Sequence, residues 1–156
     1  MILIVTLAVP ALAEEQVHFK DFLQGNEIDT VQGTTQSVDG ETTGIATHIG
    51  HVSFKYQLTV DLTNGTGTGS AQLKADNGDT IFTTVSGQFE LLKSTPDVGS
   101  VSEINTITGG TGQFAGAKGS FTVERPVIVP PSSLAGFTSG SFHGSIFLPG
   151  DGSDDE

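Results

Sequence analysis

The chain has 156 residues, an ordinary length for one domain and enough to bury a single hydrophobic core. Its 18 acidic and 6 basic side chains give a formal net charge of −12, which repels nucleic acid and anionic membrane surfaces. Because the chain has no cysteine, a disulfide framework, a thiolate nucleophile and a thiolate metal site are all excluded.

The first thirteen residues have the pattern of a secretory signal sequence. A short apolar run over residues 2–9 is followed by Pro10 and by Ala11-Leu12-Ala13, which matches an A-x-A cleavage site. The run is too short to span a bilayer, and a hydrophobic start to a buried strand would rarely end in this way. We therefore expect a signal peptide over residues 1–13 and a secreted or periplasmic protein that is not a membrane protein.

The remainder of the chain has the pattern of β-strands. From Val52 to Leu62 every second residue is apolar and the residues between are polar, and residues 81–91 repeat this pattern. A period of two places the two sets on opposite faces of an extended strand. Further strands are expected at 16–23, 28–38, 42–48, 68–75, 100–108, 115–124 and 136–148.

The turns between these strands favour antiparallel neighbours. Asn64-Gly65 and Asn77-Gly78 can adopt the positive φ of two-residue hairpins. Irregular loops are expected at 94–99 and, where prolines remove hydrogen-bond donors, at 125–133. Residues 149–156 predict a solvated acidic tail. We therefore predict one all-β domain over residues 14–148, a closed antiparallel barrel of eight or nine strands.

A glycine-rich segment carries a family resemblance. Residues 106–121 resemble the G-G-T/S-G-x-F-x-x-A-x-G hairpin shared by plant allene oxide cyclases and dirigent proteins. A phosphate-binding loop is the competing interpretation, but such a loop precedes a helix and a strand is expected here. The resemblance therefore implies an allene oxide cyclase/dirigent-like barrel. The matching positions are Gly109, Gly110, Thr111, Gly112, Phe114, Ala117 and Gly119.

Two other segments extend the resemblance. Thr47-His48-Ile49-Gly50 is similar to a segment of exported bacterial barrels of unassigned function. Residues 18–26 are similar to the first dirigent strand, in which Asp21 falls on the dirigent acid. The Glu and Asn pair of the cyclase strand is not intact, because Phe19 and Asp21 would have to replace it. The resemblance implies association as a homotrimer, but it does not transfer cyclase activity.

Three residues are candidates for a site inside the barrel. Asp21 shares a strand face with Phe19 and Leu23, where burial would raise the pKa of its carboxyl. Tyr56 lies on the apolar face of the clearest strand, where its phenol can bond a ligand in an apolar cavity. Glu103 has a weaker claim, and the competing interpretation makes it a surface acid.

The sequence predicts no metal site and no cofactor. His48 and His51 are three residues apart at a strand junction and are expected to be exposed, and His143 is expected on the outer face. Residues 76–79 have oxygen ligands, but they lack the spacing of a calcium loop. The tetrad is therefore interpreted as a turn.

Two functions follow from these residues. The first is an exported barrel that binds a hydrophobic small molecule or serves as a structural scaffold. The alternative is a cyclase or isomerase that steers a reactive apolar intermediate by shape and by one or two polar lumen groups. Whether the chain is an enzyme stays open. A lumen with a ligand-sized cavity, into which Asp21 and Tyr56 point, would favour the cyclase or isomerase, and a lumen filled by side chains would exclude it.

Overall fold

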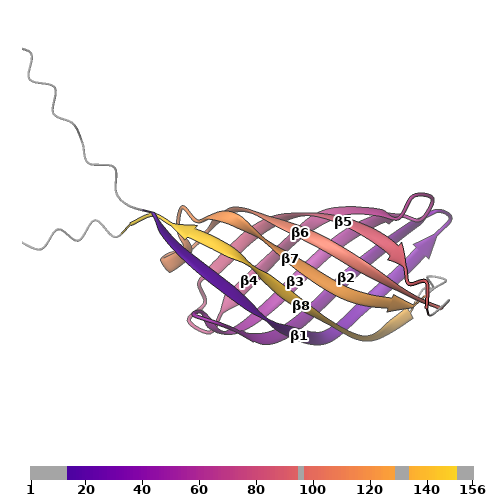
Figure 1. Cartoon of the computed structure of the whole chain (residues 1–156), viewed down its shortest axis with the longest axis horizontal. Helices are drawn as coiled ribbons and strands as arrows, with labels where there is room; N and C mark the ends of the chain where they lie inside the picture. The colour runs from indigo at the N-terminus through magenta and orange to yellow at the C-terminus, as the bar shows by residue number, and fades with distance from the viewer. Residues whose placement is uncertain (1–13, 95–96, 129–133, 151–156) are drawn as a thin grey trace, which may run out of the picture.

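The computed structural model describes residues 14–94, 97–128 and 134–150. Eight antiparallel strands follow one another around a closed barrel, because β1 pairs with β2 on one side and with β8 on the other (Figure 1). The predicted all-β barrel is confirmed, with eight strands. The strands are β1 (Glu15–Gln32), β2 (Thr35–Ala46), β3 (Gly50–Asp61), β4 (Thr66–Ala75), β5 (Thr80–Leu91), β6 (Val98–Gly110), β7 (Lys118–Ile128) and β8 (Leu134–Leu148).

The period-two pattern of the sequence becomes the wall of the barrel. On β3 the buried side chains are Val52, Phe54, Tyr56 and Leu58, whereas the alternate residues point to solvent or are partly covered. The core is therefore the lumen itself, which side chains of this kind are expected to fill in an eight-stranded barrel. No helix in the described ranges is long and apolar enough to cross a membrane.

The two ends of the barrel differ. We call one the motif end: there β1 begins, β8 ends and β6 connects to β7 through the short 3-10 helix η1 (Gly112–Phe114) (Figure 1). We call the other the hairpin end, where β1 turns into β2 and β3 into β4. The Asn64-Gly65 turn joins β3 to β4 at the hairpin end, and Asn77-Gly78 joins β4 to β5 at the motif end, as predicted.

The glycine-rich motif is fastened to the β4–β5 turn. The Thr111 amide donates to the carbonyl of Thr80 (2.8 Å), and the Thr80 amide donates to Oγ1 of Thr111 (2.9 Å). Gly112 has φ +55° and lies against Asp79, whose carboxylate would overlap a side chain at this position. Phe114 is buried beside these contacts. The motif thus covers this end of the lumen.

Several predicted boundaries were wrong. The strand predicted over 28–38 crosses the Gly33-Thr34 turn, so its residues belong to both β1 and β2. The loop predicted from Arg125 was also wrong, because β7 continues through Pro126 to Ile128. Residues 1–13 and 151–156, which contain the predicted signal peptide and most of the predicted tail, lie outside the described residues.

Candidate functional site

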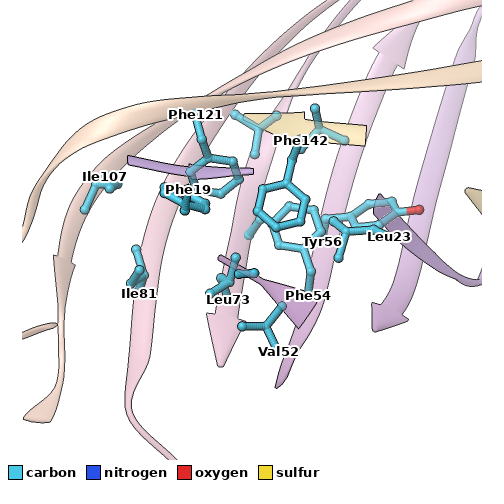
Figure 2. Close-up of a cluster of buried hydrophobic side chains, with 14 of the residues drawn as sticks. Phe19, Leu23, Val52, Phe54, Tyr56, Leu73, Ile81, Ile107, Phe121 and Phe142 are labelled. Atoms are coloured by element: carbon cyan, nitrogen blue, oxygen red, sulfur yellow. The ribbon is translucent and has the colours of Figure 1, made fainter. Parts of the chain in front are cut away.

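Aromatic rings fill the half of the lumen nearer the motif end. Phe121 of β7 contacts Phe19 of β1 (ring centroids 5.3 Å apart) and Phe54 of β3 (5.9 Å), so the rings bridge the barrel from wall to wall (Figure 2). Phe142 of β8 packs on Phe19 at 5.4 Å. Such edge-to-face contacts add to the free energy gained from burial. We call this region the aromatic half.

Inward glycines make room for these rings. Gly144 of β8 lies opposite Phe19 on one neighbouring strand and opposite Phe121 on the other. A side chain at Gly144 would meet the Phe121 side chain and the backbone of β7. Strand glycines commonly mark such close approaches. The pairing of large and absent side chains explains how the aromatic half is packed without a ligand.

The other half of the lumen contains an arginine. Arg125 lies on β7 in the inward register of Phe121 and Val123, and it is 6% exposed. Its Nη2 donates to Oε1 of Glu103 (2.7 Å) and its Nε donates to Oε2 (3.2 Å). Glu103 of β6 is itself only 3% exposed. This two-point geometry is the strong form of a guanidinium–carboxylate pair.

The remaining nitrogen of Arg125 joins three further side chains. Nη1 donates to Oε2 of Glu27 on β1, to the Tyr56 hydroxyl (3.1 Å) and to Oγ1 of Thr138 on β8 (3.1 Å). The guanidinium carbon also lies 4.9 Å from the centre of the Tyr56 ring. The arginine cluster, which we define as Glu27, Tyr56, Glu103, Arg125 and Thr138, therefore joins five of the eight strands across the lumen.

The strand register places Tyr56 within reach of Glu27. Gly40 of β2 pairs with Glu27 on one side and with Tyr56 on the other. A side chain at Gly40 would overlap the Tyr56 ring. Because that position is empty, the ring lies over β2 and its hydroxyl donates to Oε2 of Glu27 at 2.7 Å. Figure 2 shows this hydroxyl at the edge of the aromatic cluster.

Burial and neighbouring charges keep Tyr56 and Arg125 protonated. Burial raises the pKa of the Tyr56 phenol, and the Glu27 carboxylate raises it further against the opposing effect of Arg125. Burial alone would lower the pKa of Arg125, but Glu103, Tyr56 and Glu27 outweigh it and raise that pKa. The cluster thus has one permanent cation that two carboxylates share.

The side of the cluster toward the hairpin end is acidic and partly open. The Glu27 side chain is 15% exposed, and the bonds from Tyr56 and Arg125 both end on its Oε2. Two residues along β1, Oδ1 of Asp29 is buried without a hydrogen-bond partner in the described part of the chain. Burial and the nearby Glu27 raise the pKa of the Asp29 carboxyl, and Gln36 offsets part of this effect. A hydrogen bond from Gln36 thus reaches the Asp29 carboxyl, but its Oδ1 lacks the donor that a buried acceptor needs.

The structure brings together two of the three predicted site residues. Tyr56 and Glu103 both belong to the arginine cluster, and the interpretation of Glu103 as a surface acid was wrong. Asp21 has the inward register of Phe19 and Leu23 but is only half-buried, and it lines an outer groove instead of the cluster. Sequence reasoning missed Arg125, Glu27 and Thr138.

The remaining polar candidates stay on the surface. His48, His51 and His143 are exposed as predicted. Across the described ranges, no three side chains suited to metal binding gather in one place. The Asp76–Asp79 segment forms the β4–β5 turn, in which the Asp79 amide donates to Oδ1 of Asn77 at 3.0 Å.

Comparison with known proteins supports the fold. No family model and no curated protein sequence matches the chain. Among solved structures it is similar to the pterocarpan synthase dirigent protein GePTS1, with a TM-score of 0.53 and 14% sequence identity over 96% of each chain. At this identity the similarity concerns the fold alone. The chain has a dirigent-like, closed eight-stranded barrel.

Proposed function

We propose that the protein is a binding barrel that holds a small apolar molecule at the hairpin end, against the arginine cluster. The observation that supports this function is the division of the lumen. The aromatic half is filled by its own rings, which leaves the part of the lumen beyond the cluster for a ligand. There the lumen wall continues as the partly exposed apolar side chains of Val60, Phe89, Val101 and Val127.

The energetics of buried charge favour a role in recognition for the cluster. Replacing a buried ion pair by apolar side chains of similar volume is often neutral, or stabilising by about 1–4 kcal/mol. By this argument the buried pair of Arg125 and Glu103 adds little net stability to the barrel. Perturbed, buried ionisable groups are concentrated at functional sites. The cluster therefore supports a binding role better than a purely structural scaffold.

The acceptors at the edge of the cluster indicate the kind of ligand. Oε1 of Glu27 takes no part in the bonds to Tyr56 and Arg125, and Oδ1 of Asp29 lacks a donor. Both are acceptors, so the matching ligand presents an O–H or N–H group on an apolar body. A phenol or an alcohol with a hydrocarbon group has this chemistry.

The test compares 4-propylphenol with propylbenzene, which has the same apolar body without the hydroxyl. A hydrogen bond to a charged acceptor is worth about 1.5–3 kcal/mol, so the phenol should bind about tenfold more tightly or better. Protein NMR should show shifts at Val60, Phe89, Val101 and Val127. Equal affinities, or shifts confined to other residues, would show the proposal to be wrong.

A matched pair of variants locates the hydroxyl. Asp29→Asn should remove most of the preference for the phenol, because it replaces the charged carboxylate whose Oδ1 has no partner. Asp61→Asn is the control, since Asp61 is an exposed acid at the same end of the barrel. If both variants bind 4-propylphenol like the unmodified protein, Asp29 is not the acceptor.

Steering of a reactive intermediate, as a cyclase or isomerase, is the second candidate function. The observation that favours it is the Tyr56 hydroxyl, which lies between a carboxylate and a guanidinium as a general acid would. This function predicts that the protein converts a bound ligand to a product. The Tyr56→Phe variant should then still bind the ligand but no longer convert it. Binding without any conversion supports the first function.

A further inference from the structure

The lumen at and beyond the arginine cluster contains more carboxylates than cations. Glu27 and Asp29 of β1 and Glu103 of β6 lie in the inward register of their strands. Arg125 is the one cation that the described strands direct into the lumen, and the Tyr56 phenol is neutral there. Three carboxylates against one guanidinium leave two negative charges without a counter-charge. Charge that is wholly or partly buried is costly unless a partner compensates it.

The other cations of the chain do not supply the missing charge. All six lysines and arginines lie within the described ranges, so residues 95–96 and 129–133 contain none. Lys93 is exposed and follows β5, which forms the wall of the eight-stranded barrel opposite β1. The other four lie in the outward register of their strands and are exposed: Lys20, Lys55, Lys74 and Lys118. The chain itself therefore offers no second cation to these carboxylates.

Asp29 is the acid that Arg125 compensates least. Arg125 bonds to Glu103 and to Glu27, whereas Oδ1 of Asp29 is buried without a hydrogen-bond partner in the described part of the chain. Burial and the Glu27 carboxylate raise the pKa of Asp29, and the opposing effect of Arg125 is smaller than either. The position that lacks a counter-charge therefore lies beside Asp29 and Glu27, at the open side of the cluster.

We propose that the ligand of this site is an organic cation, an amine that carries its positive charge on an apolar body. This inference rests on the proposed binding function and narrows its class of ligand. The ammonium group donates to Oδ1 of Asp29 and lies near Glu27, and the body contacts the apolar wall that includes Val101 and Val127. An ammonium adds the attraction between opposite charges to the hydrogen bond that a hydroxyl also makes.

The Phe89 side chain and the charge of the whole protein favour the same ligand. Phe89 of β5 is partly exposed in the inward register, and its ring lies over Gly99 of β6, where a side chain would overlap it. The face of such a ring attracts a cation within about 6 Å. A net charge of −12 attracts cations to the protein and raises their association rate. A neutral ligand gains from neither effect.

The first experiment compares 3-phenylpropylamine with 3-phenyl-1-propanol by calorimetry at neutral pH, where the amine is protonated. The two probes have the same apolar body, so we expect the amine to bind about tenfold more tightly or better. Rising salt should weaken the binding of the amine and leave that of the alcohol nearly unchanged. An alcohol that binds as tightly as the amine would overturn this inference and leave the proposed function standing. If neither probe nor 4-propylphenol binds, both are wrong.

The second experiment locates the charge that selects the amine. Asp29→Asn should remove most of the preference for the amine, and it should fold, because it also removes a carboxylate that the folded protein destabilises. Asp61→Asn is the control, since it removes the same charge from the exterior of the same end of the barrel. A preference that survives Asp29→Asn, or equal effects of the two variants, would mean that the net charge of the protein selects the cation, and the inference would be wrong.

Discussion

Side chains fill both the aromatic half of the lumen and the level of the arginine cluster, but different interactions hold each of them together. In the aromatic half, Phe19, Phe54, Phe121 and Phe142 pack by shape against inward glycines. Beyond them the arginine cluster depends on directed hydrogen bonds and on the balance of charge. The first kind of packing tolerates apolar exchange, and the second tolerates no unpaired member. The aromatic half is therefore expected to contribute most of the stability, which leaves the cluster for the proposed role in recognition.

Removing one side chain from either half should lower the unfolding free energy by a similar amount. Phe121→Ala leaves a cavity and should cost about 3–5 kcal/mol of unfolding free energy. Arg125→Met should cost about as much, because it leaves Glu103 charged and buried. Urea unfolding measures both.

A double variant should then show that the arginine cluster, unlike the aromatic half, contributes little net stability. Glu103→Leu together with Arg125→Met removes the buried charge pair and retains apolar volume. We expect it to recover about 2 kcal/mol or more relative to Arg125→Met alone. Additive losses in the double variant would mean that the cluster is a main source of stability, and the contrast drawn between the two halves would then be wrong.

The inward glycines allow a smaller perturbation of the cluster. Gly40→Ala forces the Tyr56 ring away from Glu27 and should cost about 1–3 kcal/mol, the usual range for overpacking. Gly136→Ala is the control, because its new methyl group meets only the end of the Leu134 side chain. We expect that variant to unfold like the unmodified protein or to be slightly more stable. Equal losses would mean that strand geometry, and not the Tyr56 contact, requires Gly40.

The fold was predictable because most strands obey a simple rule. The alternation of residues 52–62 and 81–91 and the two Asn-Gly turns indicated β3, β4, β5 and their order, and the glycine-rich motif indicated the barrel type. The second half of β1 breaks the rule. There Glu27 and Asp29 face the lumen, whereas Ile28 points outward and is 58% exposed. Because the lumen is polar at that level, the alternation is inverted and the strand boundary was misplaced.

The site was only partly predictable for the same reason. Tyr56 followed from its strand, but Arg125 was assigned to a loop because Pro126 follows it. Its register with Phe121 and Val123 is visible in the sequence, and a buried Glu103 needs a cation. Only six lysines and arginines are available, so this reasoning could have paired the two residues. No local pattern pairs Glu27 with Arg125, because they are 98 residues apart and meet only when the barrel closes.

The smallest expected effect concerns two acids at the hairpin end, whose contributions to stability have opposite signs. The folded protein raises the pKa of Asp29 above 3.8, so its ionised form destabilises the fold at neutral pH, and this penalty disappears as the pH falls through the folded pKa. Asp61 is the reverse case. Hydrogen bonds from Thr63 lower the pKa of its carboxyl, and this stabilisation is present above pH 3.8 and is lost as the pH falls through the lower, folded pKa. At neutral pH, Asp29→Asn should therefore raise the urea midpoint and Asp61→Asn should lower it. Both differences should shrink in acid. If Asp29→Asn is destabilising at neutral pH, Oδ1 of Asp29 already has a donor in the unliganded protein, and it is not the open acceptor on which the proposed ligand recognition at the hairpin end depends.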